Sequence, residues 1–239
     1  AAAGFAGQGI EIHIPGKVDL ILDFLLARFF PAGQDYQPTP SYADSYRPQR
    51  SVDPIAKLLR DIEEAAQLKE KRDYTWKIKV RPIAVTLKTI YPTNTHNIKY
   101  WWAYTQYSLL VEKEHHILKG IKKVLYFDAH HEDALILKGD TCFKLAKNMQ
   151  PDDDSSSYSQ DDMADDAQKA YRTALDLPKL SAAKKSKIYF QLGEIAKEID
   201  QNKKRAQKHW QKAIDEAPNS LWAGKARQRL GIPNEVERE

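Results

Sequence analysis

The chain has 239 residues, a formal net charge of +4, and a composition that is 42% hydrophobic and 29% charged. This length allows one large or two small domains, and five tryptophans, twelve tyrosines and seven phenylalanines exclude a wholly disordered chain. The basic excess is milder than a nucleic-acid-binding protein usually shows, and basic residues gathered at 184–187 and 203–208 are typical of a solvated helix face. The single cysteine, Cys142, excludes an intrachain disulfide and a cysteine-based zinc site.

Residues 1–52 are expected to form an N-terminal arm that contains one amphipathic helix. The chain begins at Ala1, and the small residues that follow resemble those after a signal-peptidase cut, which favours an exported, periplasmic protein over a cytoplasmic one. The stretch 17–30 places apolar residues at helical spacing, but it is too short to span a bilayer and carries charged residues. Residues 31–50 are rich in proline and tyrosine, which favours an extended arm laid over another surface.

Residues 53–97 are expected to form a helical hairpin. Aspartate and proline at 53–54 are typical of a helix start, and an apolar stripe follows them. The second half of this region is ambiguous, because 76–80 alternates apolar and charged residues as a strand does, whereas the apolar residues of 83–90 follow helical spacing. We favour a helix by context, with a kink near Pro82.

Residues 98–231 contain a recurring helix–turn–helix pattern, and such self-similarity is the sequence signature of repeat proteins. A small residue where two helices cross lets their backbones approach, and an aromatic side chain opposite fills the remaining space. In the second helix of each copy, small or apolar residues recur at positions i, i+4 and i+7, namely Ile117, Ile121 and Val124, then Ala167, Tyr171 and Ala174, then Ala206, Trp210 and Ala213.

This pattern resembles the tetratricopeptide repeat (TPR) family, in which two antiparallel helices form a unit of about 34 residues. The best copy, 186–220, has Leu192-Gly193, the small and aromatic residues named above, and Pro218. The resemblance implies an all-α fold, an antiparallel helical-hairpin solenoid preceded by the amphipathic helix and the proline- and tyrosine-rich arm. The other expected parts are copies at 132–181 and 98–131, a degenerate copy at 54–94, a capping helix at 221–231 and a tail at 232–239.

The resemblance also implies a concave groove, lined by the first helix of each hairpin, that binds a peptide or a helix. Trp102 and Phe190 would anchor the ligand there, although Trp102, Phe143 and Phe190 could equally pack against the N-terminal segments. The subgroup that binds carboxylate tails is not expected, because only Lys187 matches its groove positions. The full set of groove positions is Lys99, Trp102, Gln106, Leu109, Asp133, Ile136, Asp140, Phe143, Lys187, Phe190, Glu194 and Lys197.

The sequence contains no motif for catalysis, a cofactor or a metal. There is no glycine-rich phosphate loop, and the adjacent histidines at 115–116 and 130–131 point in directions that cannot chelate one ion. The acidic stretch 148–162 lacks the glycine and closing glutamate of a calcium-binding loop, so a mobile surface loop is expected there.

The favoured function is therefore a non-enzymatic scaffold or adaptor that binds a protein partner rather than a nucleic acid. The alternative is a structural subunit of a larger cell-envelope or filament-associated assembly, held through the arm at 1–52. A hydrolase that uses a histidine pair is the least favoured. An N-terminal segment that occupies the groove would favour the structural subunit, whereas an empty groove would favour the adaptor.

Overall fold

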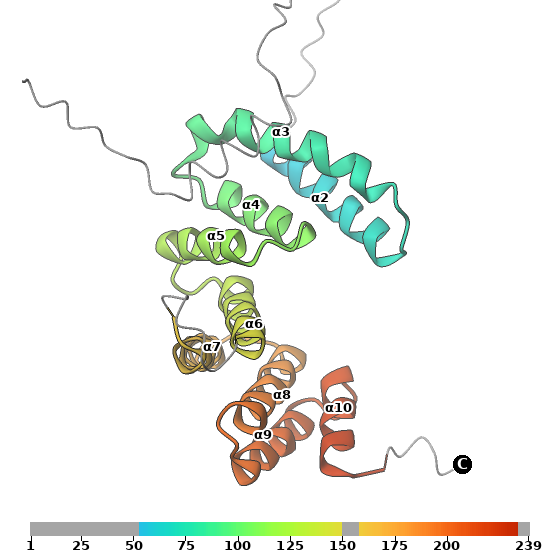
Figure 1. Ribbon diagram of the computed structural model, residues 1–239, viewed down its shortest axis with the longest axis vertical. Coiled ribbons are helices and arrows are strands. Elements are labelled where there is room, and N and C mark those ends of the chain that lie inside the picture. The colour runs from blue at the N-terminus through green and yellow to red at the C-terminus, as the bar shows by residue number, and fades with distance from the viewer. Residues whose placement is uncertain (1–52, 150–157, 234–239) are drawn as a thin grey trace, which may run out of the picture. The chain divides into compact units, whose positions relative to one another are not determined.

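The computed structural model describes residues 53–149 and 158–233, and within these ranges all regular structure is α-helical. The arm and amphipathic helix expected before residue 53, most of the acidic stretch and the end of the tail lie outside the described residues. The nine described helices (Figure 1) are α2 (Pro54–Glu70), α3 (Trp76–Asn94), α4 (Ile98–Leu110), α5 (Glu114–Phe127), α6 (Glu132–Asn148), α7 (Gln160–Leu175), α8 (Ala182–Glu198), α9 (Lys203–Glu216) and α10 (Leu221–Leu230).

Short polar side chains fix where most of these helices begin. The Asp53 carboxylate accepts a hydrogen bond from the backbone N–H of Ile55 at 2.9 Å, and Pro54 occupies the first position of α2. At the start of α7, Ser159 and Asp162 accept hydrogen bonds from each other's backbone N–H groups, each at 3.0 Å. Because these caps satisfy otherwise unpaired N–H groups, the helix starts are encoded locally in the sequence.

The ambiguous stretch after residue 74 is helical, as α3 runs through Pro82 and Pro92 without a strand. Ile83 and Leu87, which follow helical spacing, are both buried. Ile78, which belongs to the alternating pattern, is 74% exposed. The helical period therefore decides the structure, because it is the one that places apolar side chains in the core.

Consecutive helices pack against each other as hairpins: α2 with α3, α4 with α5, α6 with α7, and α8 with α9. Figure 1 shows this pairing, with α10 against α8 and α9 at the end of the described chain. First helices also contact one another across hairpins, since α2 packs on α4 and α6 packs on α8. The described chain is thus an all-helical stack of hairpins that is similar to tetratricopeptide repeats.

In each of the hairpins α6–α7 and α8–α9, a glycine on the first helix packs against an aromatic ring on the second. A Cβ atom added at Gly139 would overlap the ring of Tyr171, and one added at Gly193 would overlap the indole of Trp210. Tyr171 is fully buried and Trp210 is 4% exposed, so neither ring has room to move aside. The hairpin α4–α5 reverses the arrangement, because its glycine, Gly120, lies on the second helix and faces Thr105 on the first. This reversal explains why the first helix of the copy at 98–131 contains no glycine, unlike that of the two copies after it.

His209 on α9 is held in its neutral form. Its ring stacks on that of Tyr189 at a centroid distance of 6.4 Å, and its Nδ1 atom is buried without a hydrogen-bond partner among the described residues. Burial lowers the pKa of His209 to about 4, and repulsion by surrounding cations adds to this effect, from Arg205, Lys212, Arg172 and Lys208.

We expect His209 to weaken the fold as the pH falls. Its pKa in the folded chain lies below the ordinary value of 6.5, so the unfolded chain binds the proton more readily and stability is lost as pH decreases from 6.5 towards 4. His209→Gln should remove about 1 kcal/mol of this loss, after allowance for the part of the ring that water still reaches. Urea denaturation at pH 7.5 and at pH 4.5 measures the difference. Equal pH dependence in wild type and variant would contradict the expectation.

Candidate functional site

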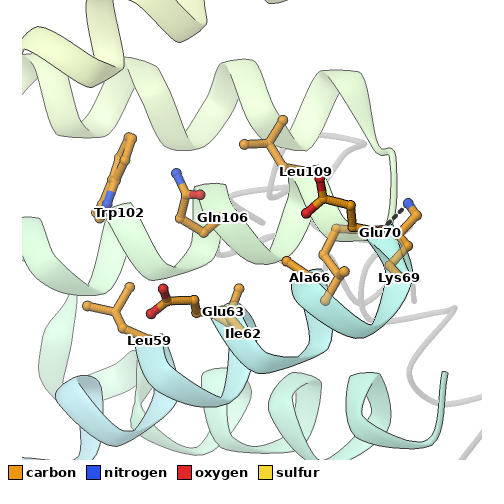
Figure 2. Close-up of a pocket in the computed structure, with 10 residues that line it drawn as sticks. Leu59, Ile62, Glu63, Ala66, Lys69, Glu70, Trp102, Gln106 and Leu109 are labelled. Atoms are coloured by element: carbon orange, nitrogen blue, oxygen red, sulfur yellow. Dashed lines mark hydrogen bonds between the residues drawn. The ribbon is translucent and has the colours of Figure 1, made fainter. Parts of the chain in front are cut away.

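A groove of about 750 Å³ lies between α2 and α4 (Figure 2). One wall belongs to α4 and contains three of the expected groove residues, Trp102, Gln106 and Leu109. The opposite wall belongs to α2. Most of the groove lining is apolar, and its charged members all come from α2. The lining residues are Leu59, Ile62, Glu63, Ala66, Lys69 and Glu70 from α2, and Trp102, Gln106, Leu109 and Leu110 from α4.

The wall formed by α2 follows from the width of that helix's apolar stripe. Leu58, Ile62 and Ala65 are buried in the core of the hairpin. Leu59 and Ala66 extend the stripe to one side, where Leu59 is half-buried and Ala66 is exposed. The apolar stripe of α2 is wider than the part that packs against α3. Its remaining edge therefore forms the apolar floor of the groove.

The wall formed by α4 consists of Trp102, Gln106 and Leu109, whose spacing of four and three residues places them on one helix face. All three are half-buried. Figure 2 shows Trp102 and Gln106 facing Leu59 and Glu63 across the groove. The groove therefore combines one large aromatic side chain with one amide above an apolar floor.

Trp102 is held in place from the side of α6. Its ring lies 4.9 Å from the ring of His131, measured between centroids. His131 is itself fixed, because its Nδ1 atom accepts a hydrogen bond from the backbone N–H of Ala134 at 3.2 Å and so caps α6. Trp102 therefore packs against a side chain whose position is set by the start of α6.

Lys69 closes one end of the groove. Its Nζ atom donates to the carbonyl of Leu110 at 2.8 Å (dashed in Figure 2) and to the carboxylate of Glu112 at 2.6 Å. It also lies 5.0 Å from the ring centroid of Trp76. The hydrogen bond from Lys69 lowers the pKa of Glu112. Since Lys69 joins the C-terminal ends of α2 and α4, its charge is already matched within the chain.

Three of the charged residues expected in the groove instead contact side chains elsewhere in the chain: Lys187 and Asp140 join neighbouring hairpins, and Glu194 joins α8 to α10. Lys187 Nζ lies 2.6 Å from Asp140 Oδ2, and the hydroxyl of Tyr171 donates to Asp140 Oδ1 at 2.7 Å. Glu194, which is buried, accepts two hydrogen bonds from the guanidinium of Arg229 on α10, at 2.7 and 3.0 Å. These side chains already have partners inside the chain.

The remaining expected residues fall into two groups. Ile136, Phe143 and Phe190 are buried, each 6% exposed. Phe190 packs on Trp222 of α10 at a centroid distance of 5.4 Å, so the chain's own last described helix covers it. Lys99, Asp133 and Lys197 are exposed, and Asp133 pairs with Lys184 at 2.7 Å. Of the expected groove residues, Trp102, Gln106 and Leu109 line the cavity between α2 and α4.

Within the described ranges, no cluster of three or more histidine, cysteine, aspartate or glutamate side chains could hold a metal ion. His116 Nδ1 lies 2.6 Å from the hydroxyl of Tyr104, and burial is the main cause of its lowered pKa. Among the helices of those ranges, none has the length and apolar character needed to cross a membrane.

Comparison with known proteins adds a fold likeness only. No protein-family model matches the sequence, and no curated protein sequence matches it. One similar solved structure is the crystal structure of MamA, which is 15% identical in sequence. The match covers 70% of this chain and 85% of that chain, with a TM-score of 0.46. The fold assignment therefore stands on the helix pairing and the glycine–aromatic contacts of this chain itself.

Proposed function

We propose that this chain is a non-enzymatic protein-interaction scaffold, and that the groove between α2 and α4 binds an apolar segment of a partner protein. The observation that carries the proposal is Trp102, a half-buried aromatic side chain at the edge of an apolar cavity. Tryptophan in such a position is typical of the residues that dominate the affinity of protein interfaces. A groove between two helices also suits a third helix or an extended peptide.

A second candidate is a structural subunit of a larger assembly. The observation that favours it is a pair of exposed apolar side chains where α3 begins: Tyr74, just before the helix, is 76% exposed, and Ile78, in its first turn, is 74% exposed. Large apolar side chains exposed close together are typical of contact surfaces. The contribution expected from the arm at 1–52 concerns residues outside the described ranges.

A photo-cross-linking amino acid at Gln106, inside the groove, tests the scaffold proposal, with the same substitution at Gln211 on α9 as the control. We expect Gln106 to cross-link to a defined partner in a native extract and Gln211 not to do so. With the purified partner, Trp102→Ala should raise the Kd about tenfold or more. Trp222→Ala, at the other end of the described chain, should change the Kd less than about twofold.

Two results would contradict the proposal. One is a partner that cross-links at Gln211 and not at Gln106. The other is a Kd that Trp102→Ala leaves unchanged while the variant keeps its helical circular dichroism. If instead Tyr74→Ser combined with Ile78→Ser releases the partner, the structural subunit becomes the better description.

A further inference from the structure

We infer that the groove between α2 and α4 selects an amphipathic helix that carries two basic residues about two helical turns apart. This inference rests on the proposed function and names the chemistry of its partner. Its basis is a pair of carboxylates, Glu63 and Glu70, that line the groove beside its apolar floor.

Both carboxylates are available to a ligand. Glu63 and Glu70 are exposed, and neither forms an ion pair or hydrogen bond with another described residue. Glu64, the neighbour of Glu63 outside the groove, pairs with Lys79 at 2.7 Å. The only cation in the lining, Lys69, is already matched by Glu112. The lining of the groove therefore carries two carboxylates on α2 that no cation of the lining pairs with.

The spacing of the two carboxylates fits a helix. Glu63, Ala66 and Glu70 follow each other at three and four residues, so they lie in one row along α2. Seven residues of helix place Glu63 and Glu70 about 10.5 Å apart along the axis. A helix that lies along this row can present Lys or Arg at positions i and i+7 to the two carboxylates.

Ala66 separates the two charges and leaves space between them. Its methyl side chain is exposed, and Leu109 lies across the groove from it (Figure 2). An apolar side chain between the two basic residues of the partner can therefore reach Leu109 and the floor. The required pattern is a basic residue, an apolar residue half-way, and a second basic residue on one helix face.

The same charges disfavour other ligands. Nucleic acid and anionic lipid both present phosphate groups, which the two carboxylates would repel. An acidic peptide would meet the same repulsion. Charges at the rim of an interface discriminate among partners more than they raise affinity, so Glu63 and Glu70 are expected to set selectivity while Trp102 supplies most of the binding.

A display library of helical peptides of about 18 residues, selected on the full chain, tests this inference. We expect the enriched peptides to carry Lys or Arg at i and i+7 with an apolar residue between them. A variant with Glu63→Lys and Glu70→Lys should instead select Asp or Glu at these two positions and keep the apolar pattern. Trp102→Ala should abolish enrichment in both backgrounds.

An enriched peptide, labelled with a fluorophore, then gives affinities by fluorescence polarisation. Glu63→Gln and Glu70→Gln should each weaken binding about two- to fivefold, as expected for one exposed ion pair. Added salt should reduce this difference. Glu64→Gln is the matched control, because that carboxylate belongs to the pair with Lys79 outside the groove, and it should leave the affinity unchanged.

The outcomes separate the two claims. Enriched peptides that depend on Trp102 but show no basic pair would overturn the inference and leave the groove as a binding site. Enrichment that survives Trp102→Ala would overturn the proposed function as well. Concentration-dependent self-association that is lost in Trp102→Ala would also overturn the inference, because the occupant would then be a second copy of the chain.

Discussion

Tyr171→Ala is expected to lower the free energy of unfolding by about 4 kcal/mol, the range found for removing a large buried aromatic side chain. Tyr171 is fully buried between α6 and α7 and packs directly on the backbone of Gly139. Its hydroxyl also donates to Asp140, which connects the hairpin α6–α7 to Lys187 of the next one. The substitution therefore leaves a cavity and removes one member of a hydrogen-bonded set.

Tyr171→Phe separates these two effects. The phenylalanine keeps the ring against Gly139 and removes only the hydroxyl, while Asp140 retains its ion pair with Lys187. We expect a loss of about 1 kcal/mol. Urea denaturation followed by circular dichroism measures both variants. Equal losses for Tyr171→Phe and Tyr171→Ala would show that the ring packing is not what stabilises the hairpin.

Gly193→Ala is expected to lower the free energy of unfolding by about 2 kcal/mol, although alanine favours helices over glycine. An added Cβ atom would overlap two atoms of the Trp210 indole, which is 4% exposed and cannot move aside without displacing α9. The steric cost exceeds the gain in helix propensity, which is about 1 kcal/mol.

Gly224→Ala provides the matched control for this substitution. Gly224 also lies within a helix, α10, but a Cβ added there would meet no atom within 4 Å apart from its chain neighbours and the backbone of its own helix. The same chemical change should therefore raise the free energy of unfolding by up to about 1 kcal/mol. Thermal or urea denaturation of the two variants should show shifts of opposite sign. A stabilising effect at both positions would mean that α8 and α9 are less closely packed than described.

The fold could be predicted because its determinants are local or strictly spaced. The caps at Asp53 and Ser159 mark helix starts within a few residues of sequence. The pairing of Gly139 with Tyr171 and of Gly193 with Trp210 appears as a recurring combination of small and aromatic residues. In a hairpin with this combination, the two helices must approach closely where they cross. The small and aromatic residues that this requires can be recognised in the sequence even though a long acidic stretch separates α6 from α7.

The site was only partly predictable, because it depends on which helix faces remain uncovered. The repeat pattern predicts Trp102, Gln106 and Leu109 in the groove but not their partners on α2, because the copy at 54–94 is degenerate. The breadth of the apolar stripe on α2 was the available signal. Phe190 was an expected anchor, yet α10 covers it, and no residue spacing reveals that contact. Likewise, Lys187 and Asp140 are 47 residues apart in the chain and pair only through packing.

The chain's one cysteine has a consequence for how its motions can be observed. Cys142 lies on α6 in the core of the hairpin α6–α7 and is 1% exposed, and burial raises the pKa of its thiol to about 11. Thiol reagents react with an accessible thiolate. In the closed hairpin the Cys142 sulfur is both shielded from the reagent and protonated, so it reacts slowly for two reasons. Modification of Cys142 therefore proceeds through open molecules. The rate of this modification therefore measures how often the hairpin α6–α7 opens in the unaltered protein, without any introduced label.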